Sequence, residues 1–276
     1  MQRLDAPCSA ASTTEQPAIV ALHCSASSPR QWASYAARLA GRVLLEAPAL
    51  IGYDDTSDWS PQDAIGLVEE AERLEPVLNS HHEAVHLVGH SYGATVALTI
   101  ARLWPQRVRS LTLYEPIPFA LLRHHTDGGP WTEIQRLASE VALSVRIGQP
   151  HRAAERFIDY WGGTSSWAGM PERRRASVSL RMAKVCREFD ALFDDPTPAH
   201  ALSLLEMPVH VLCGSDSPPP ARRTSEIVAS LCPRAELRYL PGLGHMGPVD
   251  QADIVMPFLP LASAHGARAD TPVSGP

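Results

Sequence analysis

The chain of 276 residues is 45% hydrophobic, which provides enough apolar material for one substantial core. Its 24 basic and 30 acidic residues give a formal charge of −6, so no bulk positive field favours binding to nucleic acid or an anionic membrane. The five cysteines are odd in number without paired spacing, and no stretch approaches the roughly 20 apolar residues that span a bilayer. We therefore expect a cytoplasmic protein with a small-molecule substrate and without nucleic-acid or membrane partners. The oligomeric state stays open.

Short apolar runs alternate with helical patterns along most of the chain. We expect strands at residues 18–24, 42–46, 84–89, 108–114, 208–213 and 235–240. Helices are expected between them, at residues 31–40, 61–79, 93–104, 220–231 and 249–259. This alternation predicts an α/β fold with a doubly wound, mostly parallel sheet and helices on both faces. The two ends, residues 1–17 and 261–276, have the composition of flexible tails.

One motif before the third expected strand matches a zinc-binding pattern. Residues 82–86 read His-Glu-Ala-Val-His, as in metalloproteases that place both histidines on one helix face. Here residues 84–88 read as a strand, which would separate His82 from His86 by roughly 13 Å. That separation is too large for one zinc ion, so we expect no metal site.

A glycine-flanked serine follows the third expected strand. Residues 89–93 read Gly-His-Ser-Tyr-Gly, and a long apolar segment without helix breakers follows them. A serine hydroxyl is a weak nucleophile, so an acyl-transfer enzyme exposes it at a sharp turn between a strand and a helix. Glycine two residues to each side permits that turn. We therefore interpret Ser91 as a nucleophile, with His90 supporting the turn.

Residues 117–200 are too long for a single connection between two strands. Helical patterns occupy residues 131–146, 151–160 and 171–193, and glycine-containing breaks separate them. This segment holds a large share of the aromatic side chains. Any one of them is expected to pack the segment onto the sheet, whereas collectively some are expected to line an apolar substrate pocket. The candidates for the pocket are Trp131, Tyr160, Trp161 and Trp167.

One histidine stands in a glycine-rich loop after the last expected strand. Residues 241–248 read Pro-Gly-Leu-Gly-His-Met-Gly-Pro. Among the 12 histidines, only His245 combines a terminal strand, flexible neighbours and a place in the order serine, acid, histidine. His245 is therefore the candidate base for Ser91.

These features together resemble the alpha/beta-hydrolase superfamily over roughly residues 18 to 260. The resemblance implies a core made of residues 18–116 and 201–260 and a helical cap inserted at residues 117–200. It also implies an oxyanion hole in the loop after the first strand, which in this superfamily often begins His-Gly. Here the loop begins His23-Cys24, so the resemblance implies the backbone amides of Ser25 and Tyr92 as donors. Because a cysteine replaces the usual glycine, Ala26 stays open as an alternative to Ser25.

The acid of the triad has two candidates. In residues 214–218, Gly-Ser-Asp-Ser-Pro, the position that usually carries the superfamily's acid falls on Ser217, and Asp216 stands one residue early. One branch, which includes some haloalkane dehalogenases, carries a glutamate at the end of the preceding strand, where this chain has Glu115. We favour Glu115 and retain Asp216 as the alternative.

The resemblance and the motifs predict a cofactor-independent serine hydrolase. It would form an acyl-enzyme on Ser91 with a small or medium apolar ester, thioester or lactone. A serine nucleophile argues against the dehalogenase and epoxide-hydrolase branches, which use aspartate. C–C bond hydrolysis, perhydrolysis and cofactor-free oxygenation stay open, because one fold hosts many chemistries. So does a low-turnover binding protein.

Overall fold

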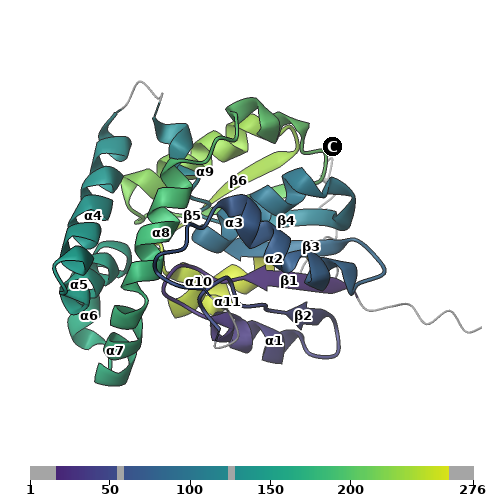
Figure 1. The fold of residues 1–276 in the computed structure, drawn as a ribbon. Coiled ribbons are helices and arrows are strands. Elements are labelled where there is room, and N and C mark those ends of the chain that lie inside the picture. The colour runs from purple at the N-terminus through teal and green to yellow at the C-terminus, as the bar shows by residue number, and fades with distance from the viewer. Residues whose placement is uncertain (1–16, 55–58, 124–127, 261–276) are drawn as a thin grey trace, which may run out of the picture.

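Among the residues that the structure describes, six strands form one central sheet in the order β2-β1-β3-β4-β5-β6 (Figure 1). The computed structural model describes residues 17–54, 59–123 and 128–260. All neighbouring strands are parallel, which confirms the expected α/β fold. The strands are β1 (Ala18–Leu22), β2 (Leu44–Glu46), β3 (Val85–His90), β4 (Val108–Tyr114), β5 (Val209–Gly214) and β6 (Ala235–Leu240). Apart from Pro17, the expected tails lie outside the described residues.

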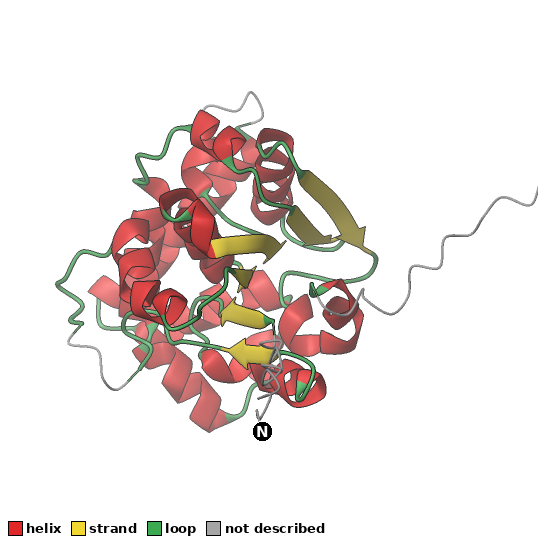
Figure 2. Cartoon of the chain, turned by 90° about the vertical axis from the view of Figure 1, so that its right-hand side faces the viewer, coloured by secondary structure: helices red, strands yellow, loops and turns green. Residues whose placement is uncertain are grey.

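Helices cover both faces of the sheet (Figure 2). The two faces are visible in β1, where Val20 and Leu22 belong to one apolar cluster and Ile19 and Ala21 to another. Alternate residues of a strand point to opposite faces, so this strand is apolar throughout because both sides are buried. The first cluster includes residues of α2 (Leu67–Asn79), α3 (Tyr92–Leu103) and α9 (Pro219–Leu231). The second includes residues of α1 (Ala33–Leu39).

Two helical expectations outside the insertion need correction. The helix expected at residues 61–79 begins only at Leu67, because Gly66 has an extended backbone with φ −107° and ψ 169°. The helix expected at residues 249–259 is wrong. The chain there forms α10 (Gly247–Asp250), α11 (Ala252–Val255) and a short 3-10 turn. Gln251 leaves the helical region with φ −136° and ψ 50°, which breaks the hydrogen-bond ladder between α10 and α11.

Between β4 and β5 the chain forms a helical layer, to the left in Figure 1. Its helices are α4 (Gly129–Arg146), α5 (Pro150–Gly162), α6 (Ser166–Gly169), α7 (Glu172–Leu180) and α8 (Met182–Phe193). The expected continuous stretch at residues 171–193 is two helices, because the backbone turns at Arg181, whose amide bonds three residues back to Val178. The division into a core and a cap unit stays a prediction. In the described part of the chain, no helix is both long and apolar enough to cross a membrane.

Candidate active site

Three residues from distant parts of the sequence meet at the carboxyl ends of the strands. Ser91 follows β3, Glu115 follows β4 and His245 lies in the loop after β6. The hydroxyl of Ser91 lies 2.9 Å from His245 Nε2, and His245 Nδ1 lies 2.5 Å from Glu115 Oε2. Parallel strands end at one edge of the sheet, so residues that follow them converge there. All three are buried, with exposed fractions of 4%, 3% and 0% for Ser91, His245 and Glu115.

The turn at Ser91 depends on the two flanking glycines. Ser91 has φ 57° and ψ −117°, a conformation that a residue with a side chain rarely adopts. A Cβ on Gly93 would stand 2.4 Å from the carbonyl oxygen of His23, and one on Gly89 would stand 2.5 Å from the Cα of Ala94. Both neighbours are backbone atoms, so neither could move aside cheaply. The glycines therefore let the start of α3 pass close to β1 and leave the serine hydroxyl exposed to the cavity.

Backbone strain concentrates around this site. In the described residues, four non-glycine residues have a positive φ, and three of them are Ala26, Ser91 and Glu115. Their φ values are 56°, 57° and 47°. Such conformations each raise the free energy of the folded state by about 1 to 3 kcal/mol and persist where the surroundings hold them. Their clustering marks this edge of the sheet as the candidate active site.

The carboxylate of Glu115 is completely surrounded by hydrogen-bond donors. Its Oε1 accepts from the Gly214 amide at 2.7 Å and from the Ser217 hydroxyl at 2.5 Å, while Oε2 faces His245. Asp216 instead has an exposed side chain that accepts a hydrogen bond from the Ser215 hydroxyl at 2.8 Å. Of the two carboxylates that the sequence left open, the structure thus brings Glu115 to His245. Ser217, at the position where the superfamily usually has its acid, donates a hydrogen bond to Glu115, the carboxylate that contacts His245.

A second histidine, His90, holds the loop that carries His245 in place. Nε2 of His90 donates to the His245 carbonyl oxygen at 2.8 Å, and its Nδ1 accepts from the Gln31 side chain at 3.1 Å. Burial, together with the nearby His245, holds the pKa of His90 well below its usual range, so His90 is neutral. The hydroxyl of Tyr114 donates to the Gly244 carbonyl oxygen at 2.7 Å. These bonds orient His245 through its backbone.

The first loop contributes a backbone amide beside the nucleophile. The amide of Ala26 donates to the Tyr53 hydroxyl oxygen at 2.8 Å, so it is already engaged. The amides of Ser25 and Tyr92 have no acceptor among the described residues, and Ser25 lines the cavity next to Ser91. This difference favours Ser25 over Ala26 as an oxyanion donor.

His23 holds this loop in place. Its Nδ1 donates to the Cys24 carbonyl oxygen at 2.8 Å, and its Nε2 accepts from the Leu50 amide at 3.3 Å. Burial lowers its pKa to about 4, so both bonds are made by the neutral ring.

A cavity of about 350 Å³ opens above Ser91. Its walls are mainly apolar, and Trp161 covers the catalytic edge, with its ring centroid 4.2 Å from that of His245. Arg174 and Asp250 are polar residues of the lining. Such a combination of apolar walls and several polar groups suits a small-molecule site.

The other three aromatic residues expected to line the pocket lie elsewhere. Trp131 packs edge-on against Phe193 at 5.3 Å, and Trp167 packs against His151 at 4.8 Å. Tyr160 stands behind Trp161, with its hydroxyl donating to Glu133 at 2.7 Å. They pack the helices together, so for these three residues the packing interpretation describes the structure and the pocket interpretation does not.

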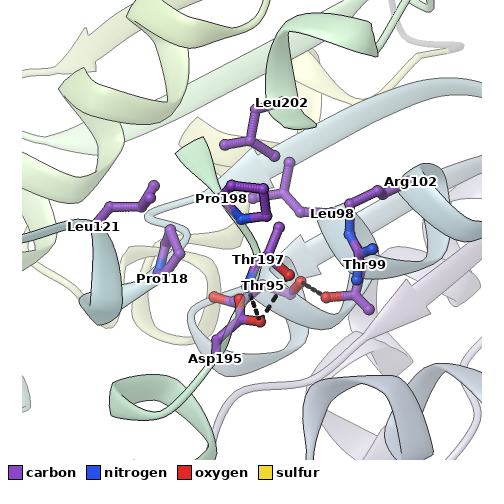
Figure 3. Close-up of a pocket in the computed structure, with 10 residues that line it drawn as sticks. All are labelled: Thr95, Leu98, Thr99, Arg102, Pro118, Leu121, Asp195, Thr197, Pro198 and Leu202. Atoms are coloured by element: carbon purple, nitrogen blue, oxygen red, sulfur yellow. Dashed lines mark hydrogen bonds between the residues drawn. The ribbon is translucent and has the colours of Figure 1, made fainter. Parts of the chain in front are cut away.

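Another pocket lies between α3 and the segment after α8 (Figure 3). It measures about 20 Å³, and its lining includes Thr95, Arg102 and Asp195. Thr95 uses its hydroxyl within the fold, since it donates to the Ser91 carbonyl oxygen at 3.3 Å. Asp195 accepts from the Thr197 hydroxyl at 2.7 Å. The lining contains neither Ser91 nor His245, so this pocket does not belong to the catalytic group.

The residues of the zinc-like pattern occupy two kinds of structure. His82 lies in the turn before β3, and His86 lies within β3, where its Nδ1 is 2.7 Å from the Ser110 hydroxyl. The one-helix geometry that the zinc pattern requires is therefore not formed by these residues.

The sequence analysis did not identify one buried carboxylate near Ser91. Glu188 on α8 lines a small pocket that adjoins the nucleophile, together with Val185 and Phe189. The sequence contained a feature that could have identified it. Glu188 lies on the apolar face of the amphipathic helix at residues 182–193, where a carboxylate is costly to bury.

Residues 19–257 match a family model described as Alpha/beta hydrolase family. The chain belongs to this family. The predicted resemblance to the alpha/beta-hydrolase superfamily is thereby confirmed, and the protein is an enzyme of the hydrolase class. No curated protein matches the sequence.

Solved structures with the same fold include several hydrolases of this family's type. A hydrolase from Pseudomonas aeruginosa PA01 has a TM-score of 0.71 and 20% identity, with 88% of each chain covered. A thermophilic esterase from Thermogutta terrifontis has a TM-score of 0.68 and 20% identity, with 88% of this chain and 87% of that chain covered. The 2-hydroxy-6-oxo-6-phenylhexa-2,4-dienoate hydrolase from Rhodococcus sp. strain RHA1 has a TM-score of 0.67 and 22% identity, covering 88% and 89%. At these identities the likeness concerns the fold.

Proposed function

We propose that this protein is a serine hydrolase that cleaves a small or medium apolar ester, thioester or lactone through an acyl-enzyme on Ser91. The observation that carries the proposal is the unbroken hydrogen-bond chain from Ser91 through His245 to Glu115 at the base of an apolar cavity. A nucleophile, a base and a group that orients the base, each within hydrogen-bond reach of the next, are the requirements of acyl transfer by serine.

Each member of this chain has a separate task. The hydroxyl of Ser91 attacks the substrate carbonyl carbon while its proton passes to His245 Nε2. The imidazolium then returns that proton to the leaving oxygen or sulfur, and a water molecule repeats the cycle on the acyl-enzyme. Glu115 accepts from Nδ1, which keeps Nε2 free as the base and stabilises the positive charge on the ring.

Two backbone amides stabilise the negative charge on the substrate oxygen. Ser25 lies in the loop after β1 and lines the cavity with Ser91, and Tyr92 is the first residue of α3, directly after Ser91. Amide groups held in advance need no reorganisation during the reaction. Loss of one such donor typically costs about 3 to 4 kcal/mol of transition-state stabilisation.

The cavity supports the assignment to a substrate class. A volume of about 350 Å³ with Phe157, Trp161 and Val178 in its walls suits a small or medium apolar group. This favours a carboxylic ester with a modest chain over a long-chain lipid.

A labelling experiment with mass mapping tests the proposal. A fluorophosphonate is expected to modify Ser91 alone, and Ser91→Ala is expected to abolish both labelling and hydrolysis of a panel of esters from acetate to octanoate. Ser25→Ala is the matched control, because it retains the backbone amide and should still be labelled at Ser91. Labelling at Ser25, or full esterase activity in Ser91→Ala, would overturn the assignment. Efficient labelling without turnover on any ester would instead indicate a binding protein.

A further inference from the structure

A second, smaller pocket opens beside the nucleophile on the side of α8. It shares Ser91, Ser25 and Trp161 with the main cavity, and it measures about 10 Å³. Such a volume holds about one water-sized group. Its far wall is one face of α8, since residues spaced three and four apart lie on the same side of a helix. The α8 residues in this wall are Val185, Glu188, Phe189 and Leu192.

Glu188 is the one acidic residue in this wall, and its carboxyl group lacks a hydrogen bond of good geometry from the described residues. The side chain is 1% exposed, and neither oxygen has a hydrogen-bond partner in the described part of the chain. Lys184 Nζ lies 3.4 Å from Oε1, as an ion pair. The hydroxyls of Ser25 and Tyr53 lie near enough to favour the ionised form, but neither reaches hydrogen-bond geometry. Burial nevertheless raises the pKa of Glu188.

The neighbouring carboxylate, Glu70, also pairs with Lys184, but unlike Glu188 it accepts several hydrogen bonds. Glu70 accepts from Lys184 Nζ at 2.7 Å, from the Tyr92 hydroxyl at 3.2 Å and from the Ile51 amide at 2.9 Å. Lys184 therefore lies closer to Glu70 than to Glu188, and the buried Lys184–Glu70 ion pair would remain without Glu188. A buried carboxyl without a well-formed hydrogen bond is costly, and a donor group on a ligand beside Ser91 would relieve that cost.

We propose that Glu188 binds a hydroxyl group on the acyl part of the substrate, so that the preferred substrate is an ester or thioester of a short hydroxy acid. This inference rests on the proposed serine hydrolase function. The hydroxyl would fill the small pocket and form the hydrogen bond that Glu188 lacks, and the scissile carbonyl would lie at Ser91.

The two pockets differ in a way that assigns the hydroxyl of the acyl part to the smaller one. The leaving group must depart, and water must enter, before the acyl-enzyme is hydrolysed. The main cavity suits the departure of the leaving group and the entry of water, because its lining continues to the exposed residues Pro171 and Arg174. The small pocket is lined mainly by buried side chains, and it suits the hydroxyl of the portion that stays bound to Ser91.

A hydroxyl fits the small pocket better than an ammonium group does. Lys184 already places a positive charge 3.4 Å from the carboxyl of Glu188, and it would repel a second cation. The remaining walls, including Ile117, Phe189 and Leu192, offer no compensation for a charge. A neutral donor avoids both penalties.

Paired substrates test this inference. The measurement is kcat/KM for ethyl butyrate and for the 2-hydroxy and 3-hydroxy derivatives, with wild type, Glu188→Met and Glu188→Gln. We expect wild type to prefer one hydroxy ester over the butyrate by about tenfold or more, the effect of one good hydrogen bond. Glu188→Met should remove the preference and keep its rate on butyrate within about threefold. Glu188→Gln should retain part of the preference, because an amide still accepts a hydrogen bond.

Asp190→Asn is the matched control, because Asp190 is exposed on the same helix and should leave the preference unchanged. Folding of each variant is checked by its melting temperature. A wild type without preference would overturn the inference. So would a preference for an amino ester, or an equal loss on all esters in Glu188→Met, which would indicate support of the Ser25 loop.

A binding arm separates this inference from the proposed function. Stabilisation of the Ser91→Ala protein by 3-hydroxybutyramide is compared with that by butyramide in a thermal shift assay, with and without Glu188→Met. A larger shift with the hydroxy amide that Glu188→Met abolishes supports the inference even if no ester is hydrolysed. Equal shifts in both backgrounds overturn it even if Ser91 is labelled and active.

Discussion

The two sides of the cavity each contain a buried carboxylate, but the two carboxylates differ in their hydrogen bonding. At the strand edge, Glu115 is fully buried and accepts from Gly214, Ser217 and His245. On the helical side, Glu188 is equally buried and accepts from none of the described residues. A satisfied carboxylate is held for one task, whereas an unsatisfied one is open to a ligand. We therefore expect changes at the strand edge to slow every substrate, and changes on the helical side to alter the choice among substrates.

The largest expected effect comes from the nucleophile. Ser91→Ala should lower kcat by about 10⁴-fold or more on every ester, because attack on the carbonyl carbon has no substitute in the site. The measurement is steady-state hydrolysis of a panel of esters with a purified variant checked for folding. A loss confined to some substrates would break the comparison, since it would mean that the strand edge also selects substrates.

The acid should give the next largest effect. Glu115→Gln should lower kcat by about 10³- to 10⁴-fold, because the amide cannot stabilise the imidazolium of His245 and can hold the wrong tautomer. Asp216→Asn serves as the control and should stay within about twofold, since its side chain is exposed and bonded to Ser215. The reverse order of the two variants would restore Asp216 as the acid. Comparable losses in both would mean that the carboxylates share the role.

The strand edge should also impose a pH dependence on stability. An unfolded histidine titrates near pH 6.5, whereas burial lowers the pKa of His23 to about 4 in the folded protein. Between these values the unfolded chain binds a proton that the folded chain does not, so stability falls as the pH falls. From pH 7 to pH 5 the loss from His23 is about 2 kcal/mol.

Urea unfolding at both pH values in wild type and His23→Gln isolates this contribution. Other buried histidines, such as His90, act with the same sign, so only the difference between the two proteins belongs to His23. Identical pH dependence in both proteins would show that the first loop does not rely on the neutral ring.

The smallest expected effect lies on the helical side. Trp161→Ala should shift the preference for ester chain length by about tenfold, because the ring forms part of the cavity wall. It should change kcat on the smallest ester much less. Trp131→Ala is the matched control, since Trp131 packs against Phe193 outside the cavity. Melting temperature is measured for both, because loss of a tryptophan can cost a few kcal/mol, roughly. Equal shifts in the two variants would remove the distinction between wall and packing residues.

Local pattern predicted the sheet well and the short helices poorly. The boundaries expected for β4 and β6, residues 108–114 and 235–240, coincide with the observed strands. Each is a short run between clear turn signals, and a buried strand leaves a strong local signature. The expected helix at residues 249–259 has no such signature, because a single residue, Gln251, breaks it through its backbone angles. Boundaries of that kind depend on packing that the pattern does not contain.

The sequence by itself predicted Ser91 and His245 as the candidate nucleophile and base, and the order in which they occur. Glycine is required at positions 89 and 93 because another stretch of backbone passes very close to each. The sequence next to Ser91 therefore shows this requirement directly. The sequence also narrowed the acid to Glu115 or Asp216. It favoured Glu115 through the resemblance, but the local pattern could not decide between the two, because a shift of one residue at a strand end changes which way a side chain points.

Only the tertiary structure decided which side chains meet. It brought Glu115 to a histidine 130 positions away, placed Trp161 in the cavity wall and left Trp131 in the packing between helices. It also revealed that Glu188 stands beside Ser91 without a hydrogen-bond partner among the described residues. The physical reason is that burial and hydrogen-bond satisfaction depend on every element packed around a group. Neighbours in the sequence supply only some of those elements.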